Sequence, residues 1–253
     1  MRFTLVRVRV PLPALSKMNY PNLNWSPELA YAVGLLTTDG NLSKDGRHIT
    51  MRSTDLDLIQ TFNQCLKINN KISINNSSAF RKPCYRVQPS NVKLYRWLIK
   101  KGLFPNKSLS IGSIKIPSRY FRDFLRGHLD GDGSIITYID KYNHYRSRVY
   151  TNHRLWVIFI SASRKHIEWI SKQIKLLTKL KGSIIERPTH NKNRVSMWSL
   201  KFSKKESISL LKWIYYKPNL PCLQRKFLHA QEVLNTIPFE KRKIYEKISK
   251  LQA

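Results

Sequence analysis

The feature that most constrains this chain is a short pattern of glycine and aspartate that occurs twice. In both copies an aspartate follows a glycine at the same offset: Asp39 follows Gly34 (39 − 34 = 5), and Asp132 follows Gly127 (132 − 127 = 5). A second glycine comes directly after each aspartate, and the two aspartates are 93 residues apart (132 − 39). A period this long predicts a duplicated domain rather than a solenoid, whose repeats are shorter.

Similar predicted elements surround both copies. Each pattern lies late in a helical segment, and the first helix has Ser26 as N-cap and Pro27 at its first position. After the first copy we expect, in order, a strand, a helix, two strands and a helix: His48–Ser53, Asp55–Leu66, Ile72–Asn75, Cys84–Gln88 and Asn91–Lys101. After the second copy we expect a polar insertion and then the same order: Arg154–Ser161, Arg164–Leu180, Ser183–Arg187, Arg194–Phe202 and Lys204–Tyr215. A last helical stretch, Cys222–Asn235, has no first-half counterpart of the same length.

The chain is therefore predicted to be an α+β protein of two tandem αββαββα repeats. We expect a basic N-terminal extension (1–24), a first repeat (25–115), a second repeat (116–236) and a C-terminal tail (237–253). The first 24 residues contain four basic residues and no acid. This extension is either a targeting segment or a loose basic arm.

Charge and composition narrow the partners. Lys and Arg total 46 against 15 Asp and Glu, a net charge of +31, which calls for a polyanion such as nucleic acid or, second, an anionic membrane surface. A hydrophobic content of 42% excludes a wholly disordered basic tail. The sequence lacks the roughly 18 consecutive apolar residues of a membrane span. Its three cysteines form no C-x-x-C pair, which favours a reducing intracellular compartment, either an organelle or a microbial cytoplasm.

Small residues give each helix that carries the pattern a face on which another backbone can approach closely. Ala30 and Gly34 are spaced i, i+4 in the first helix, as are Gly127 and Gly131 in the second. If the two faces meet around a pseudo-two-fold axis, both aspartates lie at the negative ends of the helix dipoles. The two carboxylates then repel each other unless a cation binds.

Mg²⁺, which prefers oxygen ligands, is the most suitable cation, and on so basic a protein it indicates phosphodiester chemistry. The predicted metal site comprises Asp39 and Asp132 with their neighbours Thr38 and Gly131; Ca²⁺ or Mn²⁺ are expected to substitute in binding. Two simpler interpretations exist. Asp-Gly pairs often only terminate helices. Asp130 to Gly133 also resembles part of a calcium loop, but Lys141 stands where that loop needs its bidentate glutamate.

The segment Gly127-His128-Leu129-Asp130-Gly131-Asp132-Gly133 closely resembles the motif of the LAGLIDADG homing endonucleases. The first copy is a looser match, with Thr37 where the motif often has an acid. The resemblance extends over 23–235 and implies a monomeric enzyme with two saddle-shaped antiparallel sheets, helices on one face, and double-stranded DNA bound through its major groove. It further implies that Asp39 and Asp132 hold the catalytic metal.

The resemblance also implies two catalytic lysines. Lys107, within 103–108, and Lys226, within 220–226, match the family segments that place a basic residue near the cleavage centre. There they would stabilise phosphate charge or tune the attacking water. The alternative is that either one is a solvated surface lysine.

Strand alternation identifies candidate DNA contacts in the first half. His48, Thr50 and Arg52 alternate with apolar residues, as do Arg86 and Gln88. Of these, Arg52, Arg86 and Gln88 are candidate base readers. Basic residues in predicted loops are candidates for phosphate contacts: Arg81, Lys82, Arg146, Arg148, Lys192 and Arg194. The second-half strands 154–161 and 194–202 are apolar at both parities, so their faces stay unassigned.

Together these features predict a site-specific, Mg²⁺-dependent endonuclease that makes a double-strand break in a long asymmetric DNA target, with the short 3′ overhangs that the resemblance implies. Two alternatives stay open. One is an intron-RNA maturase, and the other is a DNA-binding regulator that uses the fold without catalysis. Two retained acids argue against a purely non-catalytic role.

Overall fold

The computed structural model describes residues 23–75, 83–145, 148–189 and 195–236. The first repeat contains α1 (Pro27–Thr38), β1 (Gly40–Leu42), β2 (Ile49–Ser53), α2 (Leu56–Leu66), β3 (Ser73–Asn75), β4 (Cys84–Val87) and α3 (Val92–Lys101). Two short 3-10 helices, η1 (Lys107–Leu109) and η2 (Ser118–Tyr120), connect it to the second repeat. The second repeat contains α4 (Phe121–Gly131), β5 (Ser134–Tyr145), β6 (Arg148–Ser161), α5 (Arg164–Thr178), β7 (Ser183–Arg187), β8 (Met197–Phe202) and α6 (Lys204–Ile214), and α7 (Gln224–Thr236) follows.

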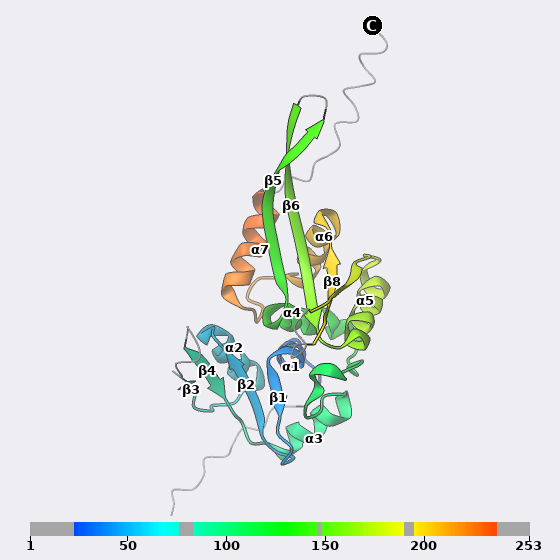
Figure 1. Ribbon diagram of the computed structural model, residues 1–253. Coiled ribbons are helices and arrows are strands. Elements are labelled where there is room, and N and C mark those ends of the chain that lie inside the picture. The colour runs from blue at the N-terminus through cyan, green and yellow to red at the C-terminus, as the bar shows by residue number, and fades with distance from the viewer. Residues whose placement is uncertain (1–22, 76–82, 146–147, 190–194, 237–253) are drawn as a thin grey trace, which may run out of the picture.

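Each repeat forms one four-stranded antiparallel sheet. The strand orders are β1-β2-β4-β3 and β5-β6-β8-β7, so corresponding strands occupy corresponding places. Helices α1 and α4 lie side by side at the centre of the molecule, between the two sheets (Figure 1). This architecture confirms the predicted α+β fold of tandem αββαββα repeats.

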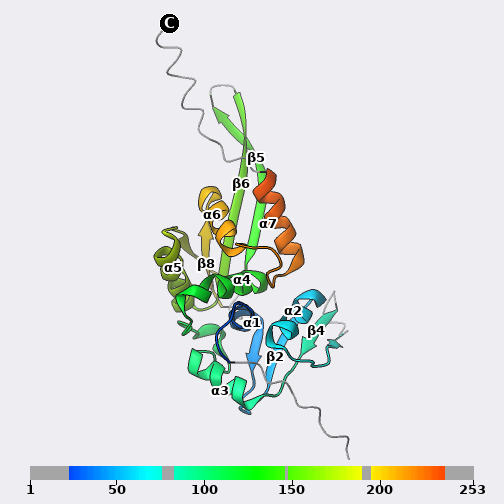
Figure 2. The same ribbon diagram turned by 180° about the vertical axis from the view of Figure 1, so that it is seen from behind.

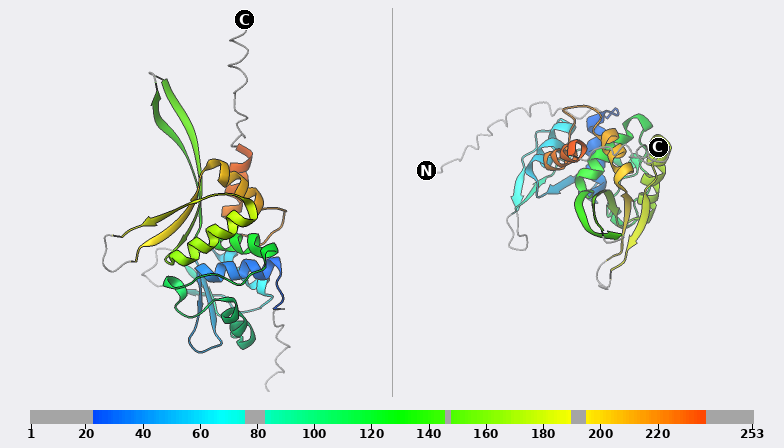
Figure 3. Two further views of the ribbon diagram at one scale, coloured as in Figure 1. Left: turned by 90° about the vertical axis from the view of Figure 1, so that its right-hand side faces the viewer. Right: turned by 90° about the horizontal axis from the view of Figure 1, so that it is seen from above.

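The helices cover one face of the sheets and leave the other open. Both sheets lie toward one side of the molecule, with α6 and α7 toward the opposite side (Figure 3). Seen from behind, α2, α6 and α7 lie in front of the strands (Figure 2). We call the face away from the helices the outer face of each sheet.

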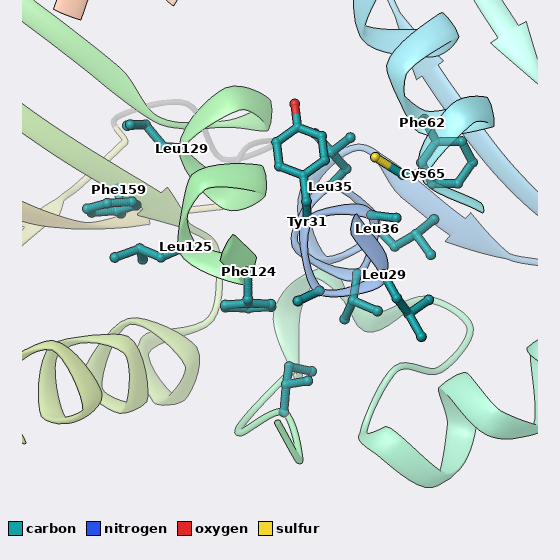
Figure 4. Close-up of a cluster of buried hydrophobic side chains, with 14 of the residues drawn as sticks. Leu29, Tyr31, Leu35, Leu36, Phe62, Cys65, Phe124, Leu125, Leu129 and Phe159 are labelled. Atoms are coloured by element: carbon teal, nitrogen blue, oxygen red, sulfur yellow. The ribbon is translucent and has the colours of Figure 1, made fainter. Parts of the chain in front are cut away.

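A continuous apolar core joins the repeats. Tyr31 and Leu35 of α1 lie between the two repeats, and the opposite side of α1 packs toward Phe62 of α2 (Figure 4). In the same way, Leu125 of α4 points toward Phe159 of β6 (Figure 4). The central helices therefore contribute to the core of their own repeat and to the contact between repeats.

The helix starts follow from the sequence. The Ser26 hydroxyl accepts a hydrogen bond from the Leu29 N–H at 3.1 Å, and Pro27 occupies the first turn of α1, as predicted. Four predicted strands begin and end within one residue of their observed bounds: β2, β3, β4 and β7. The strand predicted over Arg194–Phe202 begins at Met197, and residues 190–194 lie outside the described part of the chain.

The prediction of a polar insertion after the second motif was wrong. Those residues form β5, of 12 residues, and the first part of β6, of 14 residues. The hairpin continues well past the helices (Figure 1). The strand β1 was also not predicted, because its three residues are too few to show the alternation of polar and apolar side chains.

The predicted N-terminal extension and C-terminal tail lie almost wholly outside the described residues. Within the described residues, no helix combines the length and the apolar character needed to cross a membrane.

Candidate active site

Helices α1 and α4 approach through glycine at two equivalent points. A Cβ atom on Gly34 would lie 2.1 Å from the Phe124 carbonyl oxygen, and a Cβ atom on Gly127 would lie 2.1 Å from the Tyr31 carbonyl oxygen. Tyr31 precedes Gly34 by three residues, and Phe124 precedes Gly127 by three, so the contact has pseudo-two-fold symmetry. Ala30 is completely buried on α1. The helix backbones are therefore closer than any larger side chain would permit.

The symmetry brings the ends of the two motifs together. Asp39 caps α1 with φ −86° and ψ −4°, and Asp132 caps α4 with φ −92° and ψ −3°. A Cβ atom on Gly131 would lie 2.0 Å from Thr38 Oγ1 and 3.0 Å from Asp39 Oδ2. Thr38 and Gly131, both predicted at the metal site, thus face each other across the helix pair, where the negative ends of the two helix dipoles meet.

Burial and mutual repulsion disfavour the charged forms of both aspartates. Partial burial and the nearby carboxylate of Asp132 raise the pKa of Asp39 to about 7. Desolvation by the surrounding protein also raises the pKa of Asp132, although its side chain is exposed. A cation placed here would relieve the repulsion that raises the pKa of Asp39.

The donor set suits a hard divalent cation. The described residues contain no cluster of three or more His, Cys, Asp or Glu side chains that could enclose a metal. Two carboxylates, with the remaining positions left for water and phosphate oxygens, are the usual protein contribution to a Mg²⁺ site. The Thr38 hydroxyl donates to the Leu35 carbonyl at 2.9 Å, and the Gly131 carbonyl accepts from Lys226 at 3.3 Å. Asp39 and Asp132 are therefore the stronger ligand candidates.

Both predicted lysines are buried and reach the same point of their repeats. Lys107 Nζ donates to the Gly40 carbonyl, and Lys226 Nζ donates to the Gly133 carbonyl at 2.7 Å; each glycine directly follows a motif aspartate. Their exposed fractions are 4% and 9%, so neither is a solvated surface lysine. Burial lowers the pKa of Lys107 to about 8 and also lowers the pKa of Lys226, while the two motif aspartates oppose the decrease in each case.

The two lysines differ in how fully they are engaged. Lys226 Nζ also donates to the carbonyls of Leu129 and Asp130, at 2.7 and 2.8 Å, and to that of Gly131. It thereby satisfies the last carbonyls of α4, which have no partner within the helix. For Lys107, the structure gives one such acceptor among the described residues.

Asp130 is a buried residue whose role the sequence did not reveal. Its Oδ2 atom accepts hydrogen bonds from the Tyr31 hydroxyl at 2.8 Å and from the Leu223 N–H at 2.7 Å. It therefore links α1, α4 and the segment that leads to Lys226. Burial raises the pKa of Asp130 to about 6. The sequence signal for this role was the difference between the two motifs: the first motif has Thr37 at the equivalent position, and its hydroxyl donates to the Gly34 carbonyl of its own helix.

The outer face of the first sheet is polar. Register places Thr50 opposite Asn41, and Arg52 opposite Arg86, so these side chains share a face. Buried Ile49 and Met51 occupy the other face, next to the helices. Arg52 is exposed, and Arg86 donates a hydrogen bond to Gln88, which keeps both on the outer face.

Two predicted DNA contacts are less available than expected. Thr50 is only 6% exposed, although its parity places it on the outer face. His48 is half-buried and hydrogen-bonded to Asp45, whose pKa that contact lowers to about 2. Thr50 and His48 are therefore the weaker candidates for DNA contact, and Arg52, Arg86 and Gln88 are the better ones.

The predicted phosphate-binding loops lie mostly outside the described part of the chain. This holds for Arg81, Lys82, Arg146, Lys192 and Arg194. Arg148 begins β6, but its side chain is not described.

The faces of the second sheet, which the sequence left unassigned, follow from the strand register. Leu155 packs with Ile208 of α6 and Val233 of α7, so its parity faces the helices. Residues of the other parity form the outer face, and several of them are large and apolar: Ile136, Tyr138, Trp156, Ile158, Ile160 and Ile185. Among the described residues, the two outer faces therefore differ in chemistry.

Comparison with known proteins gives a result at the level of fold. No protein-family model matches the sequence, and no curated protein matches it. The solved structure of the LAGLIDADG homing endonuclease I-LtrWI bound to target DNA is similar over 91% of this chain and 96% of its own, with a TM-score of 0.58 and 13% identity.

Two further structures give the same picture. Meganuclease I-SmaMI bound to uncleaveable DNA covers 83% of this chain and 90% of its own, with a TM-score of 0.54 and 13% identity. Full-length DUF199/WhiA from Thermatoga maritima covers 90% of this chain and 68% of its own, with a TM-score of 0.51 and 13% identity. These likenesses show that the chain has the LAGLIDADG fold.

Proposed function

We propose that the protein is a site-specific, metal-dependent endonuclease that hydrolyses phosphodiesters in both strands of duplex DNA. One observation carries the proposal. The ends of α1 and α4 bring two carboxylates, Asp39 and Asp132, to one place, and a buried lysine backs each of them. A fold alone needs no paired carboxylates at two negative helix ends, because such an arrangement costs stability.

Asp39 and Asp132 would hold the metal, for which Mg²⁺ is the natural choice. When bound, such an ion lowers the pKa of water and stabilises charge on phosphate oxygens. The carboxylates also orient whatever they bind, since both are fixed as helix caps. The backbone carbonyls of Thr38 and Gly131 are secondary candidates for binding the metal.

Lys107 supplies positive charge beside the carboxylates, where a phosphate would gain negative charge during reaction. Its ammonium group donates to the Gly40 carbonyl and has further protons to offer. Lys226 holds the end of α4 in place through four backbone carbonyls and so acts on Asp132 through position. We therefore assign the direct role to Lys107 and the positioning role to Lys226.

The outer faces of the two sheets are proposed to lie in the DNA major groove, with Arg52, Arg86 and Gln88 reading bases in one half-site. The bound DNA named for I-LtrWI and I-SmaMI supports DNA as the ligand. A net charge of +31 suits a polyanion. Because the repeats differ in sequence and one chain contains both, the target is expected to be asymmetric and the protein to need no second copy.

A cleavage screen tests the proposal. Full-length protein is incubated with a randomised duplex library in Mg²⁺ and separately in Ca²⁺, and the cut ends are sequenced. The expected result is one long asymmetric motif, cut in Mg²⁺ and bound in Ca²⁺. Asp132→Asn tests the role of the carboxylate, because it keeps the size of the side chain and removes the charge. Cleavage at the full rate by this variant would refute the mechanism.

A DNA-binding regulator is the second candidate, because the likeness to DUF199/WhiA shows that the fold is not confined to chains named as homing endonucleases. Salt-sensitive duplex binding without cleavage in any divalent metal would support it. Tight binding to structured intron RNA in place of duplex DNA would instead support a maturase.

A further inference from the structure

The outer face of the second sheet carries an apolar cluster that no core covers. Ile136 and Tyr138 are 38% and 44% exposed and lie beside Trp156, while Ile185, which is 45% exposed, lies on the same face two strands away. The opposite parity of the same strands supplies the core residues, such as Leu155. The cluster therefore lies outside the core. A ligand that covered it would gain free energy, because apolar surface would be removed from water.

The cluster is held rigidly and is bordered by positive charge. The Tyr138 and Trp156 rings meet edge to face with centroids 5.2 Å apart. Lys201 Nζ lies 3.1 Å from the centroid of the Trp156 ring, a cation–π contact that fixes the lysine beside the aromatic pair. Arg187 is exposed on the same face, at the end of β7. Rigid apolar groups edged by cations suit a ligand that is apolar where it meets the sheet and anionic around it.

Continuity with the candidate active site indicates which ligand this is. An open cavity beside Asp132 is lined by Ser134 and Ile136, so the apolar cluster begins where the site ends. A duplex that reaches Asp132 would continue over Tyr138 and Trp156. In the major groove, the one apolar group that a base pair presents is the C5 methyl of thymine. On its outer face the first sheet has Arg52, Arg86 and Gln88 instead, and these side chains suit the hydrogen-bonding groups on the edges of bases.

We propose that the second sheet recognises its half-site through thymine methyl groups, with Ile136, Tyr138 and Ile185 as the contacts, so that this half-site is T·A-rich. The first sheet reads its half-site mainly by hydrogen bonds. This inference rests on the proposed DNA-binding function and adds the base class that each half recognises.

Replacing thymine with deoxyuridine tests the inference, since uracil keeps every hydrogen bond and lacks only the methyl. The preferred duplex from the library is prepared with uracil in one half-site or in the other. A thiol-reactive photocrosslinker identifies the first half-site. It is attached to Cys84, which shares the outer face of the first sheet with Arg86, in a background with Cys222→Ser.

We expect uracil in the second half-site to weaken binding in Ca²⁺ by about fourfold for each contacted methyl, because one methyl contributes roughly one buried carbon. Uracil in the first half-site is expected to change affinity less than twofold. Ile136→Ala and Ile185→Ala should reduce the sensitivity of the second half-site to uracil, whereas Arg52→Ala should leave it unchanged.

Equal affinity for the thymine and uracil forms of the second half-site, with cleavage intact, would overturn this inference and leave the proposed function standing. Failure of the wild-type protein to bind any duplex would refute the proposed function itself. A dimer in sedimentation that Ile185→Glu converts to monomer would show that a second copy covers this face, and it would also overturn the inference.

Discussion

The two repeats have equivalent backbone geometry and contacts at their motifs, but they differ in the surroundings of their lysines and in their sheet faces. Each ends its central helix at an aspartate with almost the same backbone angles and brings a buried lysine to the following glycine. Lys226, however, donates to three carbonyls of α4 and to that of Gly133, whereas Lys107 donates to one described carbonyl, that of Gly40 just after α1. The outer sheet faces differ as well, since exposed apolar side chains such as Ile136 and Tyr138 occur on the second sheet where the first carries Arg52, Arg86 and Gln88.

Some features of the repeats are required by the duplicated fold, and others have diverged between the two repeats. The glycine contacts occur in both repeats because neither helix can meet its partner without them, whereas the paired aspartates are not required by the helix contact. The lysine environments and the sheet faces diverge because each repeat would meet a different strand and a different half-site.

The largest effect is expected at the helix contact. Gly34→Ala and Gly127→Ala each place a Cβ atom 2.1 Å from a backbone carbonyl oxygen, which no rotamer change can relieve. Each should destabilise the protein by more than the roughly 1–3 kcal/mol typical of overpacking. Thermal unfolding measures this, and Gly112→Ala is the control, since nothing lies within 4 Å of its added Cβ. Clearly unequal losses of thermal stability in the two variants would show that the two helices are not equivalent at this contact.

The two lysines should separate catalysis from stability. Lys107→Met is expected to reduce cleavage about a hundredfold or more, by analogy with the loss of one donor to developing charge. Lys226→Met leaves four carbonyls at the end of α4 without their donor and should cost about 3 kcal/mol or more of stability, since each unsatisfied buried group costs ~1–3 kcal/mol. Urea unfolding and single-turnover cleavage of both variants test the distinction. Equal stability losses would contradict the different roles assigned to them.

A smaller effect is expected from pH in the metal-free protein. The pKa of Asp39 is about 7 in the folded chain, above its unfolded value of 3.8. The folded state therefore binds this proton more tightly, so the contribution of Asp39 to stability is greatest at low pH and is lost as pH rises from about 4 to 7. Asp39→Asn should raise the melting temperature at pH 8 and leave it nearly unchanged at pH 4. A variant that loses stability at pH 8 would argue against repulsion at this site.

The smallest effect is expected at the contact between α7 and the first repeat. Arg225 Nε and Nη2 donate to the two carboxylate oxygens of Asp55 at 3.0 and 2.9 Å, and the arginine side chain is largely exposed. Arg225→Ala should reduce the free energy of unfolding by about 0.5–1 kcal/mol, as for other exposed pairs. Salt at 1 M should abolish the difference, and a difference that persists in salt would indicate lost packing instead.

The repeat, the fold class and the pairing of Asp39 with Asp132 could be predicted because they rest on local spacing. The glycines at i, i+4 and the helix-ending aspartates are properties of single helices, and two helices of one kind suggest their own contact. Lys107 and Lys226 could be named only from the family resemblance, since burial of a lysine depends on distant parts of the chain.

Long-range contacts explain what the sequence could not reveal. Asp130 bonds to Tyr31, 99 residues away, and to Leu223, 93 residues away, and no local pattern indicates either contact. Trp156 and Tyr138 lie on the open face of a sheet that is apolar on both sides, so alternation could not assign them. Thr50 has the right parity for the outer face and is nevertheless buried.

Cleavage of a supercoiled plasmid that carries the selected target tests the central claim most directly, namely that the two repeats assemble one composite metal site from Asp39 and Asp132. The wild-type protein, Asp39→Asn, Asp132→Asn and the double variant are compared in Mg²⁺, with binding in Ca²⁺ measured in parallel.

The account predicts linear product from the wild-type protein, and double-strand cleavage at least a hundredfold slower in each single variant with binding retained. The double variant should bind the target and cut neither strand. Linear product formed at the wild-type rate by either single variant would contradict the account, because that aspartate would then take no part in the site.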